Sequence, residues 1–436
     1  MNGGRKGKGR GGKRINIYNR KFDEQIDGVI HDIKLENMKF NRPNIYELEK
    51  INKLIKQFIV KKGLKLYGGH AINHFMPEGK KIYDGTSIDD YDIYCKDAEK
   101  DGKDMADVLY KAGVEYVSLS VGAFGDNRKL FCSFAEVANF TTLPKKLFDA
   151  IPVVADKKSG VSYVEPDYLK MDLRVSIVNP RISLWRWIKD YGRMQILEKE
   201  YPFKKPANCK WPVMDAVDKK DLAELVEVIK DWRSETVLVG WCALSAYIKE
   251  SGMSKVIGAP SGVGVEIMSV KIKEIIDEIM KRFGNKRFVY RVEEDPLHIL
   301  PKKFVVAGRK SGKELLVIYS LLEHCVPWVK MGGVRVVSAD YLILYMQVQM
   351  YTVGMIGSKT DVLLYRCGLY GFDKMREKWL GDKGKDVFDK TLYQMHIIDC
   401  YGQFVNPYYK TLIDKWERKG TTKKTTRLPT KLLKND

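Results

Sequence analysis

The chain has 436 residues, of which 44% are hydrophobic, and a formal net charge of +20 at pH 7. This length allows two or three domains with their own cores, and the composition excludes a wholly disordered chain. No long apolar run predicts a membrane span. The positive charge favours a polyanionic partner, most simply a nucleic acid.

The seven cysteines are odd in number, scattered along the chain and without a CxxC motif. This pattern predicts unpaired thiols in a reducing compartment and no structural zinc site. The N-terminus lacks the apolar segment of a signal peptide.

Both ends of the chain are basic and poor in apolar residues. Residues 1–40 are predicted to form a disordered arm, and residues 418–436 a basic tail. They could be solubilising tails, but the net charge favours contact with RNA phosphates without sequence preference. The candidate RNA-binding cations of the arm are Arg5, Lys6, Lys8, Arg10, Lys13 and Arg14.

The first half of the chain has the pattern of an α/β (α+β) domain over residues 41–205. Asn44 and Glu47 form a capping pair before a helix with apolar residues at helical spacing, which Gly63 ends. Mixed strands and helices then predict a mixed sheet with helices against one face. The expected elements are a strand at Leu64–Tyr67, a helix from Gly68 to about Met76, an acidic strand at 87–94, a helix ending near Ala112, strands at Val114–Phe124 and Lys129–Phe140 around a turn at Gly125–Asn127, and a strand at Tyr168–Val178.

A weaker copy of the first strand-to-helix turn is found in residues 206–335. Gly240 takes the place of Gly68, and Glu266, 26 residues later, takes approximately the place of Asp92. Trp241 replaces the second glycine, so a repeat here would keep the fold and lose a metal site. A chance likeness of two such turns is the alternative. Residues 336–417 are predicted to be mostly helical.

The chemistry is predicted to lie at Asp90 and Asp92, which point to one face of a strand because they are two residues apart. Paired carboxylates suit Mg²⁺, and the upstream Gly68-Gly69 lets a phosphate approach backbone N–H groups. Two metal ions held in this way support nucleotidyl transfer. Thr86 and Ser87 are further candidates to hold a triphosphate, or else form a plain turn.

Arg186, Lys189 and Arg193 have the spacing of one helical stripe. Such a stripe could neutralise a triphosphate or a primer backbone. A solvated helix face with an internal Lys–Asp pair is the alternative.

Several longer segments between about residues 60 and 205 resemble the poly(A) polymerase catalytic subunits of large cytoplasmic DNA viruses, of the asfarvirus and giant-virus type. They include Leu66–Gly69 with Asp90–Asp92, Val137–Pro144, Phe148–Pro152, Pro166–Leu173 and Arg186–Asp190. The resemblance implies a nucleotidyltransferase palm, followed by a second, degenerate nucleotidyltransferase-like domain. It implies AMP transfer from ATP to RNA 3′ ends without a template, using two Mg²⁺ or Mn²⁺ ions. It also implies a cytoplasmic viral factory or the virion as the location, and a homodimer or a second processing subunit as the assembly.

One position departs from the family pattern. Asn139 stands where the family usually has an acid that looks like the third metal ligand. Asp172 is a substitute, expected on the next strand, and Glu136 would serve only if a bulge turned it to the same face. The departure leaves open a weakened or non-catalytic RNA-binding or assembly subunit on the same fold. Nucleotide transfer to another acceptor is a third hypothesis.

Overall fold

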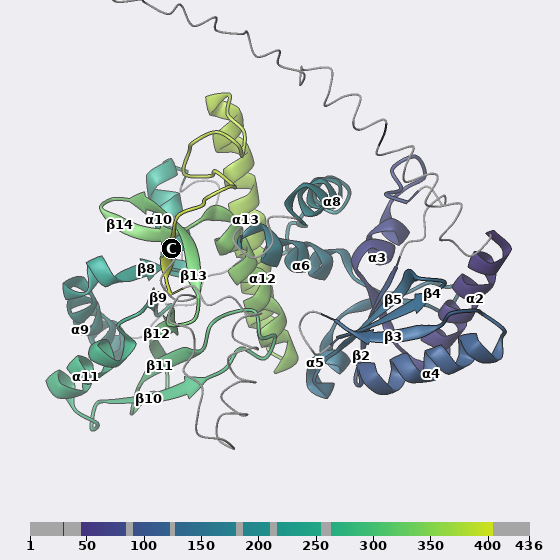
Figure 1. The fold of residues 1–436 in the computed structure, drawn as a ribbon. Coiled ribbons are helices and arrows are strands. Elements are labelled where there is room, and N and C mark those ends of the chain that lie inside the picture. The colour runs from purple at the N-terminus through teal and green to yellow at the C-terminus, as the bar shows by residue number, and fades with distance from the viewer. Residues whose placement is uncertain are drawn as a thin grey trace, which may run out of the picture.

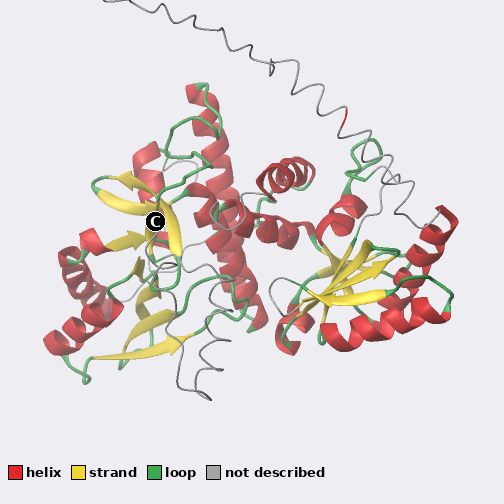
Figure 2. Cartoon of the chain, viewed as in Figure 1, coloured by secondary structure: helices red, strands yellow, loops and turns green. Residues whose placement is uncertain are grey.

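The structure is a computed structural model that describes residue 29 and residues 45–83, 90–122, 127–179, 186–209, 216–253 and 263–403. Two β-sheets, each flanked by helices, lie on either side of a group of helices that includes α6 (Pro166–Ile177), α12 (Ala339–Met355) and α13 (Lys359–Lys383) (Figures 1 and 2). In both figures the first sheet, with α2 (Ile45–Lys62) and α4 (Ala98–Lys111), lies on the right.

The first sheet has seven strands in the order β3-β4-β5-β2-β1-β7-β6. The centre of this mixed sheet has β1 antiparallel to β2, while β1 is parallel to β7 and β2 is parallel to β5. Its strands are β1 Lys65–Tyr67, β2 Tyr91–Cys95, β3 Ser118–Val121, β4 Asn127–Cys132, β5 Ala135–Thr142, β6 Val153–Ala155 and β7 Ser162–Val164, and its other helices are α3 Gly68–Phe75, α5 Lys145–Ala150 and α8 Trp187–Glu200.

The early elements agree with the predictions. Apolar side chains at helical spacing on α2, among them Ile51, Ile55 and Ile59, are fully buried in the main core. Gly63 follows α2 with a φ of +62°, which glycine adopts without strain. The chain therefore turns directly into β1 and then into α3, so that the glycine bend lies at the end of a buried strand.

Two predictions in this half were wrong. Residues 166–177 form helix α6 instead of a strand, with Pro166 in its first turn. The alternating apolar residues suggested a strand, but α6 is buried on several sides because it packs against α8 and α12. The expected strand Lys129–Phe140 is two strands, β4 and β5, separated by a turn at Ser133 and Phe134 with left-handed backbone.

The second sheet has eight strands in the order β10-β11-β12-β9-β8-β14-β13-β15. Seven of them correspond one by one to the first sheet, because β8 is antiparallel to β9 and parallel to β14, and β9 is parallel to β12. The elements are α9 Ala216–Asp231, β8 Thr236–Leu238, α10 Gly240–Ser251, β9 Val265–Ser269, α11 Ile272–Phe283, β10 Phe288–Glu293, β11 Lys303–Gly308, β12 Glu314–Ser320, β13 Cys325–Met331, β14 Val334–Val337 and β15 Cys400–Gly402. This correspondence agrees with the suspected repeat, while the predicted domain boundaries stay a prediction. The expected helical C-terminal region contains α12 and α13 and also the short strand β15.

The helices between the sheets share a buried ion network. Asp340 on α12 is 4% exposed, and its carboxylate lies 3.3 Å from Nη1 of Arg376 and 3.6 Å from Nε of Arg174. Arg174, on α6, also donates to Gln347 at 3.0 Å and forms an ion pair with Glu198 on α8. Both arginines are buried, so their charges depend on these partners. The network ties the first sheet's helices to those of the second.

An Asp340→Ala variant is expected to lose about 3–5 kcal/mol in free energy of unfolding, because it leaves two buried guanidinium groups without this carboxylate. Asp382→Ala is the matched control. Asp382 is half-exposed on α13, and among the described residues its one ion pair is with Lys378, so the loss in this variant should stay below about 1 kcal/mol. Urea unfolding measures both. Equal losses in the two variants would contradict the assigned role of the network.

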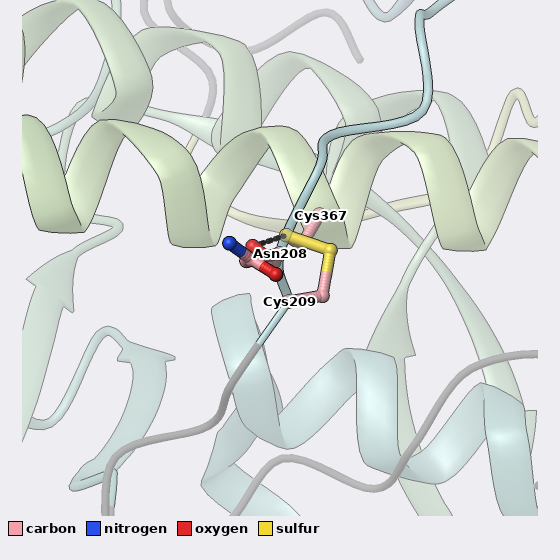
Figure 3. The surroundings of a disulfide bond; sticks show 3 residues. All are labelled: Asn208, Cys209 and Cys367. Atoms are coloured by element: carbon pink, nitrogen blue, oxygen red, sulfur yellow. Dashed lines mark hydrogen bonds between the residues drawn. A yellow bond between two sulfur atoms is a disulfide. The ribbon is translucent and has the colours of Figure 1, made fainter.

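The prediction of unpaired cysteines was wrong for four of the seven. Cys209 pairs with Cys367 of α13 (Figure 3), and Cys325 pairs with Cys400. The partners are 158 and 75 residues apart in sequence, so spacing along the chain gave no sign of them. Cys95, Cys132 and Cys242 are not in disulfides. Within the described residues no helix is long and apolar enough to cross a membrane.

Candidate active site

The two motif aspartates lie at the centre of the first sheet. Asp92 on β2 is paired with Tyr67 at the end of β1 and with Asn139 on β5, and Asp90 immediately precedes β2. Because directly paired residues share a face of the sheet, the Asp92 side chain lies on the same face as those of Tyr67 and Asn139. At the same ends of these central strands, β1 turns into α3.

The carboxylate of Asp92 lies against the glycine bend. Gly68 has a φ of +64°, and a Cβ built on it would lie 2.0 Å from Oδ2 of Asp92. Only glycine accepts both this backbone conformation and this approach. The structure therefore brings together the two halves of the motif, the bend and the acidic strand.

Negative charge is concentrated at this point. The pKa of Asp92 is raised to about 7, first by burial and then by the nearby carboxylates of Asp90 and Asp172, while Arg186 and Arg193 act in the opposite direction. Burial likewise raises the pKa of Asp172 to about 6. Carboxylates crowded in this way favour either a proton or a cation, and hard oxygen donors suit Mg²⁺ or Mn²⁺.

Asp172 reaches the site from a helix, because residues 166–177 form α6 and not the expected strand. It lies close enough to influence the pKa of Asp92, so the structure does group it with the two motif aspartates. Among the described residues, however, no cluster of three His, Cys, Asp or Glu side chains has the geometry of a metal site. The third ligand is thus not assigned by geometry.

Asn139 and Glu136 share a face of β5. The pairing of β4 with β5 skips Val137, so β5 carries an extra residue there. Because Lys129 pairs with Asn139 and Phe131 with Glu136, the bulge brings both side chains to one face. The carboxylate of Glu136 is nevertheless bound by Lys129 at 2.7 Å, and Oδ1 of Asn139 accepts a hydrogen bond from Asn127 at 3.2 Å.

Gly69 is covered by two side chains, one of which sequence reasoning missed. A Cβ on Gly69 would lie 1.7 Å from the hydroxyl of Tyr83 and 3.0 Å from Nη2 of Arg193. Tyr83 belongs to no recognisable motif, so only the fold places it here. The second glycine of the bend is therefore required by Tyr83 in this structure.

The basic stripe predicted from the sequence lies along α8, beside the acidic cluster. It consists of Arg186, which directly precedes the helix, and of Lys189 and Arg193 within it. Burial alone would lower the pKa of Arg186, but Asp190, Asp172 and Asp92 raise it overall. The pKa of Lys189 is lowered by burial and by the neighbouring Arg193 and Arg186. The expected internal pair exists as well, but between Arg186 and Asp190, at 3.1 Å. Three cations thus gather beside the carboxylates.

The other predicted site residues cannot be placed. Thr86 and Ser87 lie outside the described residues, and so do the six cations of the N-terminal arm, Arg5, Lys6, Lys8, Arg10, Lys13 and Arg14. Their predicted roles stay predictions.

The corresponding point of the second sheet has a different chemistry. Gly240 has a φ of +58°, and a Cβ on it would lie 1.7 Å from Oε2 of Glu266. That carboxylate accepts hydrogen bonds from the backbone of Trp241 at 2.7 Å and from Tyr345 at 2.6 Å. Glu266 therefore occupies the place of Asp92, but as a hydrogen-bonded group in the core, with Gly264 where Asp90 would be.

The buried Glu266 carboxyl group is expected to make the free energy of unfolding depend on pH. Burial raises its pKa from 4.5 to about 7, so the folded chain holds a proton that the unfolded chain releases. Its contribution is complete below about pH 4.5 and is lost as the pH rises to about 7. Glu266→Gln keeps a side-chain oxygen that can accept the hydrogen bond from Tyr345, but it does not titrate. Across that window the free energy of unfolding of the variant should therefore fall by about 3 kcal/mol less than that of the native chain.

Urea unfolding at several pH values measures this difference. The exposed Glu227→Gln is the control, and its stability should follow the native curve. Parallel curves for Glu266→Gln and the native chain would contradict the assignment.

Comparisons with known proteins find viral poly(A) polymerases. Residues 52–183, which include β1, the glycine bend and β2, match the model of the family described as the poly(A) polymerase catalytic subunit. A "Putative poly(A) polymerase catalytic subunit" of Acanthamoeba polyphaga mimivirus is 22% identical over 438 residues, which cover 88% of this chain and 72% of that protein. The chain is related to viral poly(A) polymerase catalytic subunits. The resemblance predicted from the sequence is thus confirmed.

Two further relatives define the extent of the likeness. A protein of the same description from African swine fever virus is 30% identical over 166 residues, which cover 36% of this chain and 34% of that protein. The crystal structure of the Megavirus polyadenylate synthase superposes with a TM-score of 0.82 at 21% identity, covering 96% of this chain and 86% of that chain. The sequence likeness is strongest over a limited region, whereas the fold is shared over nearly the whole length.

Proposed function

We propose that the chain is a template-independent polynucleotide adenylyltransferase, which adds AMP from ATP to RNA 3′ ends in mRNA polyadenylation. The observation that carries the proposal is the contact between Asp92 and Gly68, with Asp90 and Asp172 nearby. The relationship to viral poly(A) polymerases supplies the nature of the substrates.

Asp90 and Asp92 would hold two divalent cations, Mg²⁺ or Mn²⁺, with the phosphates of ATP as their remaining ligands. Such cations acidify the RNA 3′ hydroxyl and stabilise charge on the attacking and leaving oxygens. The backbone N–H groups of Gly68 and Gly69, with Thr86 and Ser87, would seat the phosphates. Arg186, Lys189 and Arg193 would neutralise the triphosphate, and Asp172 would support Asp92 from α6 or serve as a further acid.

The basic arm and tail would hold the RNA through its phosphates. A viral factory or the virion is the proposed location, on the strength of the viral relatives. The disulfides remove the earlier support for a reducing compartment. A homodimer or a second processing subunit remains a proposal that rests on the family resemblance. The second sheet is proposed to be a degenerate nucleotidyltransferase-like domain.

Incubation of the protein with a labelled oligo(A) or oligo(U) primer and one NTP at a time tests the proposal. With ATP and Mg²⁺ or Mn²⁺ a ladder of extended products is expected, and with GTP, CTP or UTP much less product. Products formed without RNA would indicate another acceptor. Primer binding without extension under any condition would exclude the proposed activity.

A weakened or non-catalytic RNA-binding or assembly subunit is the alternative function. It is favoured by Asn139, a neutral amide paired with Asp92 across the sheet and hydrogen-bonded to Asn127. Asn139→Asp distinguishes the two functions. Extension that increases in this variant would show a weakened site, and a silent variant that still binds primer would support a non-catalytic subunit.

A further inference from the structure

The hydroxyl of Tyr83 and the guanidinium of Arg193 meet over Gly69. Nη2 of Arg193 donates a hydrogen bond to the Tyr83 hydroxyl at 3.1 Å, and the guanidinium carbon lies 5.8 Å from the centre of the tyrosine ring. Both groups approach the face of Gly69 that a Cβ would occupy. The contact joins the segment before β2 to helix α8, across the bend where the phosphates of ATP are proposed to bind.

The position of Tyr83 is fixed from α3. The side-chain oxygen of Asn73 accepts hydrogen bonds from the backbone N–H groups of Ile82 and Tyr83, at 2.9 and 3.3 Å. The tyrosine ring also lies 5.3 Å from the ring of His70, which stacks on Tyr91. The hydroxyl is thus held at one place relative to the glycine bend, because its anchors belong to the same helix.

Arg193 is a cation without a carboxylate partner in the described part of the chain. Neighbouring Arg186, in contrast, is paired with Asp190. A guanidinium presents several N–H donors in one plane, which suits the oxygens of a phosphate. With one of these donors used by a neutral hydroxyl, Arg193 keeps its full charge for an anion at the bend.

We propose that Tyr83 is a positioning residue that holds Arg193 over Gly69 as a preformed arm for the triphosphate. The inference rests on the proposed function in its choice of ATP as the ligand, but it concerns binding and not turnover. A side chain held in the bound geometry loses less conformational entropy when the ligand arrives. Loss of the tyrosine hydroxyl should therefore weaken triphosphate binding through Arg193.

A double-mutant cycle tests this coupling. The dissociation constant of ATP with Mg²⁺, and that of inorganic triphosphate, are measured by titration calorimetry without RNA. Tyr83→Phe is expected to weaken both about 3- to 10-fold, and Arg193→Met about 10-fold or more. In the Arg193→Met background, Tyr83→Phe should add less than about 2-fold, because the group that it positions is absent.

Three controls separate positioning from a structural effect. Tyr110→Phe changes an exposed tyrosine, and its affinity for ATP should equal that of the native chain. Thermal unfolding should be the same for Tyr83→Phe and the native chain. In primer extension, Tyr83→Phe should raise the KM for ATP with little change in kcat or in primer affinity.

The inference would be overturned if Tyr83→Phe weakened ATP binding by the same factor in the native and the Arg193→Met backgrounds. It would also be overturned if Tyr83→Phe weakened the binding of ATP but not that of inorganic triphosphate. A native chain that binds ATP with the predicted coupling but extends no primer would reject the proposed function and leave this inference standing. If the native chain extends primer but Tyr83→Phe binds ATP with native affinity, the proposed function would stand and this inference would be rejected.

Discussion

Gly68→Ala is expected to abolish primer extension, with a loss of at least about 10²-fold in kcat/KM, while most of the fold is retained. An added methyl group would lie 2.0 Å from Oδ2 of Asp92, so the carboxylate must move by more than the tolerance of a positioned catalytic group. The backbone at φ +64° adds a further cost of about 1–2 kcal/mol for any residue with a Cβ. Primer extension at saturating RNA, together with urea unfolding, measures both effects.

The chain offers two matched controls for this variant. Gly63 has a φ of +62°, and no atom of the described residues lies within 4 Å of a Cβ built on it, so Gly63→Ala should reproduce the backbone cost and leave activity intact. In Gly240→Ala the added methyl group would collide with the Glu266 carboxylate, as the methyl group of Gly68→Ala collides with that of Asp92. Gly240→Ala should therefore destabilise the chain without a direct effect on the candidate active site. Full activity in Gly68→Ala would show that the Asp92 carboxylate need not lie against the bend.

The local motifs predicted the centre of the site, because their geometry is set by neighbouring residues in sequence. The two carboxylates lie at the start of β2 and the two glycines follow β1, so the motifs need only the pairing of β1 with β2 to meet. The helices α2 and α4 were likewise evident from their apolar spacing. By contrast, α6 has apolar residues at both strand and helix spacing, and its burial between α8 and α12 decided the outcome.

The parts that sequence could not reveal depend on contacts between distant segments. Tyr83 reaches Gly69 only because Asn73 holds the chain after α3, and the disulfides join segments that no motif connects. The bulge at Val137 was a stated possibility for Glu136, yet the ion pair with Lys129 was not foreseeable from spacing. For Asp172 the position was predicted but not the element, since this residue lies near Asp92 although it belongs to helix α6 and not to the expected strand.

Primer extension by the double variant Asp90→Asn/Asp92→Asn tests the central claim most directly. Asparagine keeps the volume of each side chain and removes the two charges that would hold the cations, so folding should be preserved and stability should not fall. Asp92 in particular is buried with a pKa raised to about 7, so a neutral side chain should be well tolerated there. The control is primer affinity, which should equal that of the native chain.

We expect extension with ATP and Mg²⁺ to fall by at least about 10³-fold, because loss of the bound cations removes several kcal/mol of transition-state stabilisation. The same loss is expected with Mn²⁺. Extension within about 10-fold of the native rate, in a preparation free of native protein and with normal primer affinity, would contradict the assignment of these two carboxylates as the metal-binding centre.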